Sequence, residues 1–171
     1  MNPHLKKLID IAISQVGTRE EGGNNNGAKI REYQQATWLT PAAWSWCAAF
    51  MAWCMREWLK DPEVLKSLKL KDDESFAWRC RDASAFGWAK WGIAKHLYIT
   101  DEKEPAKAGD IVVFDFSHIG LVVEDQLPGK DYIETVEGNT NGKGDRDSVL
   151  GDGVWRKQRK VNLVKNYIRI L

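Results

Sequence analysis

Residues 44–54 form an almost wholly apolar stretch with a cysteine, Cys47, near its beginning. The run stays apolar on all sides as far as Met55, which predicts a central, buried helix over residues 47–60. At the start of a helix, backbone N–H groups lack partners and the helix dipole favours negative charge. A thiol at such a position tends to become a thiolate, and the same N–H groups can form an oxyanion hole. Cys47 is therefore the first candidate for a nucleophile.

The other two cysteines, Cys54 and Cys80, are interpreted as small buried hydrophobic residues, and Cys47 itself has that alternative. Three cysteines cannot all pair within one chain. Together with the absence of a secretory signal at the N-terminus, this predicts free thiols made in a reducing cytosol. Neither the cysteines nor the three histidines have zinc-ligand spacing, so we predict no metal and no cofactor.

A histidine and two polar residues follow in the order that a cysteine hydrolase requires. His118 directly precedes an apolar run at 119–123, and Gly120 beside it leaves room for an imidazole to approach a thiol. Glu137 and Asn139 lie two positions apart on a predicted strand, so we expect both on one face, where either can orient His118. The alternatives are a structural histidine and a simple turn after residue 137.

Composition limits the other functions. The chain has 171 residues, enough for one domain, 1–171, and its apolar fraction of 43% is ordinary for a globular protein. A net charge of +1 predicts no nucleic-acid partner, and no window is long and apolar enough for a membrane span. Four basic residues near the C-terminal end are interpreted as a solvated strand face, with weak attraction to an anionic wall polymer as the alternative: Lys157, Arg159, Lys160 and Lys165.

The order of the predicted elements gives an α+β fold class. Helical spacing of apolar residues predicts helices at 5–16, 28–36 and 47–60, with short ones near 64–68 and 83–91. The composition of residues 63–95 suits a lid or the wall of a groove. Strand-like runs follow at 110–116, 119–124, 132–137, 154–161 and 167–171.

Three of these motifs resemble one known family. The segment 46–50 resembles the nucleophile motif of CHAP-domain peptidoglycan hydrolases, which belong to the larger NlpC/P60 class of papain-like cysteine peptidases. Residues 108–114 and 118–123 are similar to the histidine motif of that family, and 137–139 to its Glu-x-Asn site. The early loop at 20–25 is similar to single-domain members. The likeness covers about residues 10–160 in the right order.

The resemblance implies a papain-like NlpC/P60 fold, with N-terminal helices packed on a small antiparallel sheet, and hydrolysis of an amide bond in the peptide part of peptidoglycan. The enzyme would be an N-acetylmuramoyl-L-alanine amidase or an endopeptidase. Cys47 would attack the carbonyl, His118 would act as base and then acid, Glu137 would orient His118, and Asn139 would assist the orienting residue or the substrate. Trp46 and Ser117 are predicted to contact the substrate. The aspartate-rich calcium loop of some members is not present before Cys47.

These expectations extend to the setting of the protein. It would be a monomer, made in the cytoplasm, that acts in the periplasm or cell wall as a phage endolysin or as a secreted antibacterial effector. A delivery machinery and a cognate immunity or inhibitor protein are the expected partners besides peptidoglycan. Two alternatives stay open: a catalytically silent module that binds wall peptides or a partner, and a cysteine protease or deamidase that acts on protein.

Overall fold

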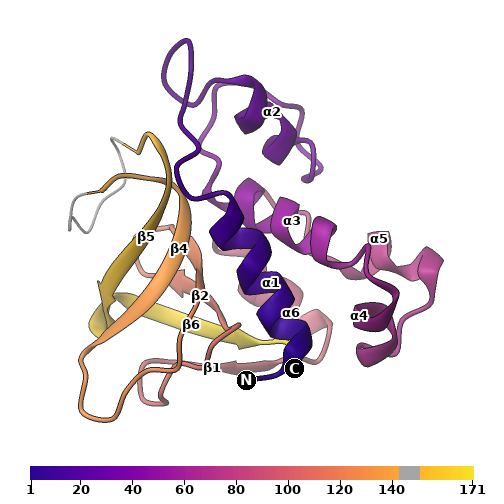
Figure 1. The fold of residues 1–171 in the computed structure, drawn as a ribbon, viewed down its shortest axis with the longest axis vertical. Helices are drawn as coiled ribbons and strands as arrows, with labels where there is room; N and C mark the ends of the chain where they lie inside the picture. The colour runs from indigo at the N-terminus through magenta and orange to yellow at the C-terminus, as the bar shows by residue number, and fades with distance from the viewer. Residues whose placement is uncertain (143–150) are drawn as a thin grey trace.

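The computed structural model describes residues 1–142 and 151–171 and has helices on one antiparallel sheet, the α+β class predicted above. Figure 1 shows the helices gathered on one side of the curled sheet, and α1, α3 and α6 contact its strands. The α-helices are α1 Pro3–Ser14, α2 Ala28–Gln34, α3 Cys47–Trp58, α4 Pro62–Ser67, α5 Ser75–Trp78 and α6 Gly87–Ala94. Two short 3-10 helices are η1 Asp72–Glu74 and η2 Val161–Leu163.

The sheet has six strands in the spatial order β1-β6-β2-β3-β4-β5, and all neighbours are antiparallel. The strands are β1 Tyr98–Thr100, β2 Ile111–Phe114, β3 Ile119–Val122, β4 Tyr132–Thr140, β5 Gly153–Lys160 and β6 Val164–Arg169. The sequence did not predict β1, a short strand that pairs with β6 at the edge of the sheet. Strand β6 begins at Val164, earlier than the predicted strand at 167–171. Strand β4 extends to Thr140, beyond the predicted end at residue 137.

Helix α3 lies at the centre of the molecule, as its apolar sequence predicts. Its first nine residues are all buried, and the helix contacts α1, α2, β3 and β4. Burial on every side leaves no room for a polar face, which explains why the amphipathic pattern of α1 is missing here. The nucleophile candidate therefore begins the most deeply packed helix of the fold.

The middle of the sheet is covered on both faces. Along β2, Ile111 and Val113 pack in the core between the helices and the sheet, whereas Val112 and Phe114 belong to a smaller apolar cluster on the other face. Side chains alternate between the faces of a strand, so a strand covered on both sides is apolar throughout. This packing fixes the β2–β3 hairpin that carries His118. No helix of the described residues combines the length and the apolar character needed to cross a membrane.

Candidate active site

Cys47 is the first residue of α3 and is 5% exposed. The residue before it, Trp46, occupies the N-cap position without a side-chain hydrogen bond to the helix, so no side chain caps the first turn. Strand β4 passes close to this turn at Gly138, where a Cβ would lie 2.6 Å from the Cβ of Phe50. Glycine at this position therefore lets β4 approach the start of α3.

The segment that leads into the nucleophile is held from α2. Arg31 donates hydrogen bonds to the carbonyl oxygens of Asn25 (3.1 Å) and Ala42 (2.5 Å), and the amide of Gln34 donates to those of Ala42 (2.7 Å) and Trp44 (3.1 Å). Ala42 and Trp44 lie in the segment that leads directly into Cys47, whereas Asn25 belongs to the loop before α2. This support was not predicted from the sequence, because arginine and glutamine side chains such as Arg31 and Gln34 are mostly found on exposed helix faces.

His118 closes the hairpin between β2 and β3. Its carbonyl oxygen accepts a hydrogen bond from the N–H of Phe114 (2.9 Å), and Ser117 just before it has a φ of 60°. A left-handed residue in a three-residue loop is a common way to join two antiparallel strands. The imidazole lies against the rings of Phe114 and Phe116, with centroid distances of 5.9 and 5.7 Å. Packing thus fixes the plane of a ring that is 3% exposed.

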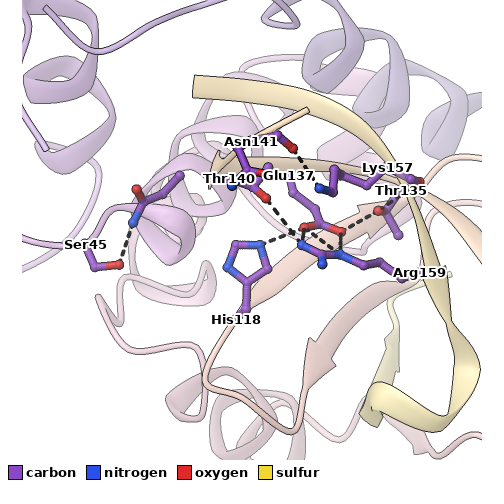
Figure 2. A network of polar contacts seen from close by, with 9 residues as sticks. Ser45, His118, Thr135, Glu137, Thr140, Asn141, Lys157 and Arg159 are labelled. Carbon is purple, nitrogen blue, oxygen red and sulfur yellow. Dashed lines mark hydrogen bonds and ion pairs between the residues drawn. The ribbon is translucent and has the colours of Figure 1, made fainter. Parts of the chain in front are cut away.

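Glu137 on β4 receives hydrogen bonds from several buried side chains, shown in Figure 2. Oε2 lies 2.8 Å from His118 Nε2, and the hydroxyl of Thr135 donates to Oε1 at 2.6 Å. Arg159 on β5 donates from Nε to Oε1 at 2.9 Å and from Nη2 to Oε2 at 2.6 Å. Gly120 leaves space for this arrangement, since a Cβ there would lie 2.6 Å from Cγ of Glu137.

The charges of this network support one another. Burial favours the neutral form of Glu137, but the His118 and Arg159 cations outweigh it and lower the pKa of the carboxyl to about 2. Burial likewise lowers the pKa of His118, yet the Glu137 carboxylate and a hydrogen bond with Cys47 outweigh it and raise the pKa to about 9. Glu137 is thus an anion that stabilises the imidazolium form of His118.

The structure places Cys47 next to His118, close enough for the thiol to contribute to the raised pKa of the imidazole. Nε2 of the ring is engaged by Glu137, so Nδ1 is the nitrogen left to face the sulfur. The order is sulfur, imidazole, carboxylate, guanidinium. Three members were predicted from the sequence, and Arg159 was not.

Asn139 does not share the face of Glu137, contrary to the alternation expected along the strand. The pairing of β4 with β5 shifts register between Glu137 and Thr140, and Asn139 has a φ of 54°. Thr140 takes the place next to Arg159, with its hydroxyl 3.3 Å from Nη2. The Asn139 amide instead donates to the hydroxyl of Ser45 at 2.6 Å, two residues before the nucleophile. It therefore contacts the helix side of the site rather than the imidazole.

Two further predictions change once the side chains are placed. Trp46 has no exposed surface, and its indole N–H donates to Glu20 at 2.8 Å, so the side chain packs in the core rather than facing a substrate. The predicted solvated basic face on β5 is wrong for Lys157 and Arg159, which are 5% and 2% exposed. Ser117 is exposed beside His118, and its role in substrate binding stays a prediction.

The described residues contain no group of three or more His, Cys, Asp or Glu side chains placed to hold a metal ion. Cys54 and Cys80 are buried away from the network, and desolvation raises the pKa of both thiols, that of Cys80 to about 12. They therefore stay protonated at neutral pH.

Comparison with known protein families gives a match over the segment that carries Cys47, His118 and Glu137. Residues 35–139, more than half of the chain, match the model of the CHAP domain. The chain is a member of the CHAP domain family. CHAP domains are typically cysteine- and histidine-dependent amidases or peptidases, so membership indicates a peptidoglycan hydrolase in general terms and a papain-like α+β fold. No curated protein and no solved structure matches the chain. Strand β5 with Arg159 lies beyond the CHAP match.

Proposed function

We propose that this CHAP domain hydrolyses an amide bond in the peptide part of peptidoglycan, with Cys47 as nucleophile and His118 as general base and acid. The observation that carries the proposal is the continuous contact from Cys47 through His118 to Glu137. A thiol in contact with an imidazole that a buried carboxylate orients is the arrangement that activates a cysteine nucleophile. The three groups come from α3, the β2–β3 hairpin and β4, which the core holds in place.

The reaction then follows from the placement of the groups. His118 takes the proton of Cys47, and the sulfur attacks the carbonyl carbon of the substrate amide. The carbonyl oxygen becomes an anion at the start of α3, where the uncapped N–H groups, that of Cys47 among them, stabilise it. His118 gives the proton to the leaving nitrogen as the C–N bond breaks, which leaves a thioester on Cys47.

Water completes the cycle. His118 removes a proton from a water molecule, whose oxygen attacks the thioester carbon, and the sulfur leaves and regains its proton from His118. The products are a carboxylic acid and an amine. Glu137 holds the ring through Nε2 during both half-reactions and compensates the positive charge each time His118 is protonated. We further propose that the enzyme meets this substrate outside the cytoplasm, after phage lysis or secretion.

The first test measures the chemistry of the thiol. At neutral pH, iodoacetamide should alkylate Cys47 much faster than Cys54 or Cys80, because Cys47 lies at a helix start beside His118, whereas desolvation raises the pKa of the other two thiols. The variant His118→Ala should remove the advantage of Cys47. Peptide mass spectrometry measures the three rates in one sample. Equal slow alkylation of all three thiols would contradict the proposed nucleophile.

The second test identifies the bond. Purified sacculi digested with the wild-type enzyme should release soluble fragments, whereas Cys47→Ala should lose about 10³-fold or more of the activity with its melting temperature nearly unchanged. Fragments with a new N-terminal alanine and free glycan indicate an amidase. Shortened stem peptides still linked to muramic acid indicate an endopeptidase. Intact sacculi beside cleaved or deamidated protein substrates would overturn the proposal.

A further inference from the structure

A hollow of about 340 Å³ lies apart from the catalytic residues, beside the segment that leads from α2 to Cys47. Trp38 forms part of its rim, and the rest of the lining comes from residues 77–94, the region whose composition suits a groove wall. Arg79 donates from Nη1 to the carbonyl oxygen of Ala36 at 2.5 Å, and the N–H of Trp38 donates to that of Arg81 at 3.1 Å. The two sides of the hollow are therefore joined by hydrogen bonds.

The lining carries more positive than negative charge. Arg79, Arg81 and Lys90 face one acidic residue, Asp82, whose carboxylate accepts a hydrogen bond from the N–H of Ser84 at 2.8 Å. Among residues 1–142 and 151–171, none of the three cations forms an ion pair with a carboxylate. The guanidinium groups of Arg81 and Arg79 lie 4.0 and 5.4 Å from the ring centroid of Phe76, and an anionic ligand would add the ion-pair partner that this ring does not supply.

Arg79 is the buried cation of this lining, and other cations lie near it. It is 8% exposed, and burial together with the nearby Arg81 and Arg56 cations lowers its pKa to about 10. A buried guanidinium surrounded by cations is stabilised when an anion enters the hollow. The charge and the burial therefore both favour an anionic ligand.

The aromatic residues indicate what else the ligand contains. Trp38 is 64% exposed, although its backbone is tied to Arg81. Trp91 forms another part of the wall, and its indole N–H donates to the carbonyl oxygen of Trp78 at 2.8 Å, which fixes the ring. A broad exposed indole next to the cations of the lining suits a ligand with a flat apolar face and acidic substituents. A sugar ring linked to an acidic peptide has both features.

We propose that this hollow binds a disaccharide-peptide unit of peptidoglycan, with a sugar ring against Trp38 and the carboxylates of the stem peptide at Arg81 and Lys90. The inference rests on the proposed function, because it takes the same polymer as the ligand. Trp38 on the rim and the nucleophile belong to one chain segment, residues 38–47.

The experiment uses the full chain with Cys47→Ala, so that binding is measured without hydrolysis. Two hollow variants are added to it: Trp38→Ala, and the pair Arg81→Glu with Lys90→Glu. Their matched controls are Leu39→Ala, an exposed neighbour of Trp38, and the pair Lys66→Glu with Lys69→Glu, which changes the net charge equally on exposed residues outside the hollow. The probes are a purified soluble disaccharide-peptide in calorimetry and purified sacculi in a pelleting assay.

Both hollow variants should bind the soluble probe about fivefold or more weakly than the parent, and the controls should bind as the parent does. The charge variant should also remove most of the salt dependence of pelleting. Equal binding by all variants would overturn the inference. Loss of protein binding to sacculi after phosphate polymers are stripped from them would also overturn the inference, because the ligand would then be a phosphate polymer.

A parallel assay with Cys47 intact separates this inference from the function. If wild-type enzyme digests sacculi and the hollow variants digest and bind them equally well, the hollow is not a binding site and the hydrolase proposal stands. If wild-type enzyme neither digests nor binds sacculi, the proposed function fails and the inference fails with it. Unchanged alkylation of Cys47 in the hollow variants shows that the catalytic thiol is intact in each.

Discussion

The helix side and the sheet side of the catalytic site are built from different interactions. On the helix side, Cys47 sits at an uncapped helix start, and the segment before it is held by hydrogen bonds to backbone carbonyls and by the neutral Asn139–Ser45 pair. On the sheet side, His118, Glu137 and Arg159 form a buried chain of charges, each no more than 3% exposed. The helix side therefore fixes the position of the Cys47 sulfur, and the sheet side stabilises the charged forms of His118 and Glu137.

This difference separates the consequences of mutation. A change on the sheet side alters the protonation of His118 and leaves a buried charge without its partner, which is costly in a low-dielectric interior. A change on the helix side displaces the sulfur by a small distance and leaves the titration of the site as it was. Substitutions on the sheet side should therefore change both the stability and its pH dependence. Substitutions on the helix side should change only the rate of hydrolysis.

The largest effect is expected for Arg159→Met. The substitution removes the guanidinium hydrogen bonds to Glu137 and leaves the carboxylate with its hydrogen bonds to His118 and Thr135 (Figure 2). The free energy of unfolding should fall by about 3–5 kcal/mol, the usual cost of breaking a buried ion pair from one side. Urea denaturation measures the loss. Arg159→Lys, which keeps the charge but not the fork, should lie between wild type and Arg159→Met.

The neighbouring residue supplies the control. Lys160 on the same strand is exposed and pairs with Asp131 on the surface, so Lys160→Met should change the unfolding free energy by less than about 1 kcal/mol. Equal stability of Arg159→Met and Lys160→Met would show that the guanidinium is not needed to hold Glu137.

The failure to foresee Arg159 has a simple physical cause. Residues 156–160 are all polar, so the alternation between buried and exposed positions leaves no trace in their hydrophobicity. In the structure, Lys157 and Arg159 are buried, whereas their neighbours on the strand are exposed. Cys47 and His118 were predictable because each stands at the edge of a clear apolar run. Arg159 is buried because it pairs with Glu137, and no apolar run beside it in the sequence indicates that burial.

The pH dependence of stability should be smaller and should come from the same side. In the Cys47→Ala background, where the thiol cannot contribute, His118 keeps a raised pKa because of Glu137, about 9 in the intact site against 6.5 when unfolded. A raised folded-state pKa adds stability that is complete below pH 6.5 and is lost as the pH rises towards 9. The slope is at most about 1.4 kcal/mol per pH unit.

The carboxylate acts in the opposite direction. Glu137 has a lowered pKa, so its contribution is complete above about pH 4.5 and is lost as the pH falls towards 2. Urea denaturation between pH 6 and 9 should show the alkaline decline, and adding His118→Gln should flatten it. An equally steep decline without the histidine would assign it to other groups.

Asn139 shows a second limit of sequence reasoning, different from that of Arg159. Residues two apart on a regular strand share a face, so Glu137 and Asn139 were both expected on the face where either could orient His118. A register shift after Glu137 breaks the alternation, and the left-handed backbone at Asn139 directs its side chain to Ser45. Glycine and asparagine at 138–139 are compatible with such a turn, but the sequence does not say which side chain faces which element.

The smallest effect is expected for the Asn139–Ser45 pair. Ser45→Ala and Asn139→Gly, in which glycine preserves the positive φ, should each lower kcat/KM by about 2–10-fold, the value of one hydrogen bond. The kcat/KM of the double variant should equal that of the less active single variant, because both substitutions break the same hydrogen bond. Hydrolysis rates from pH 5 to 9 should keep the same profile in all three. A shifted profile would mean that Asn139 influences His118 after all, and the separation between a positioning side and a charged side would fail at the residue that joins them.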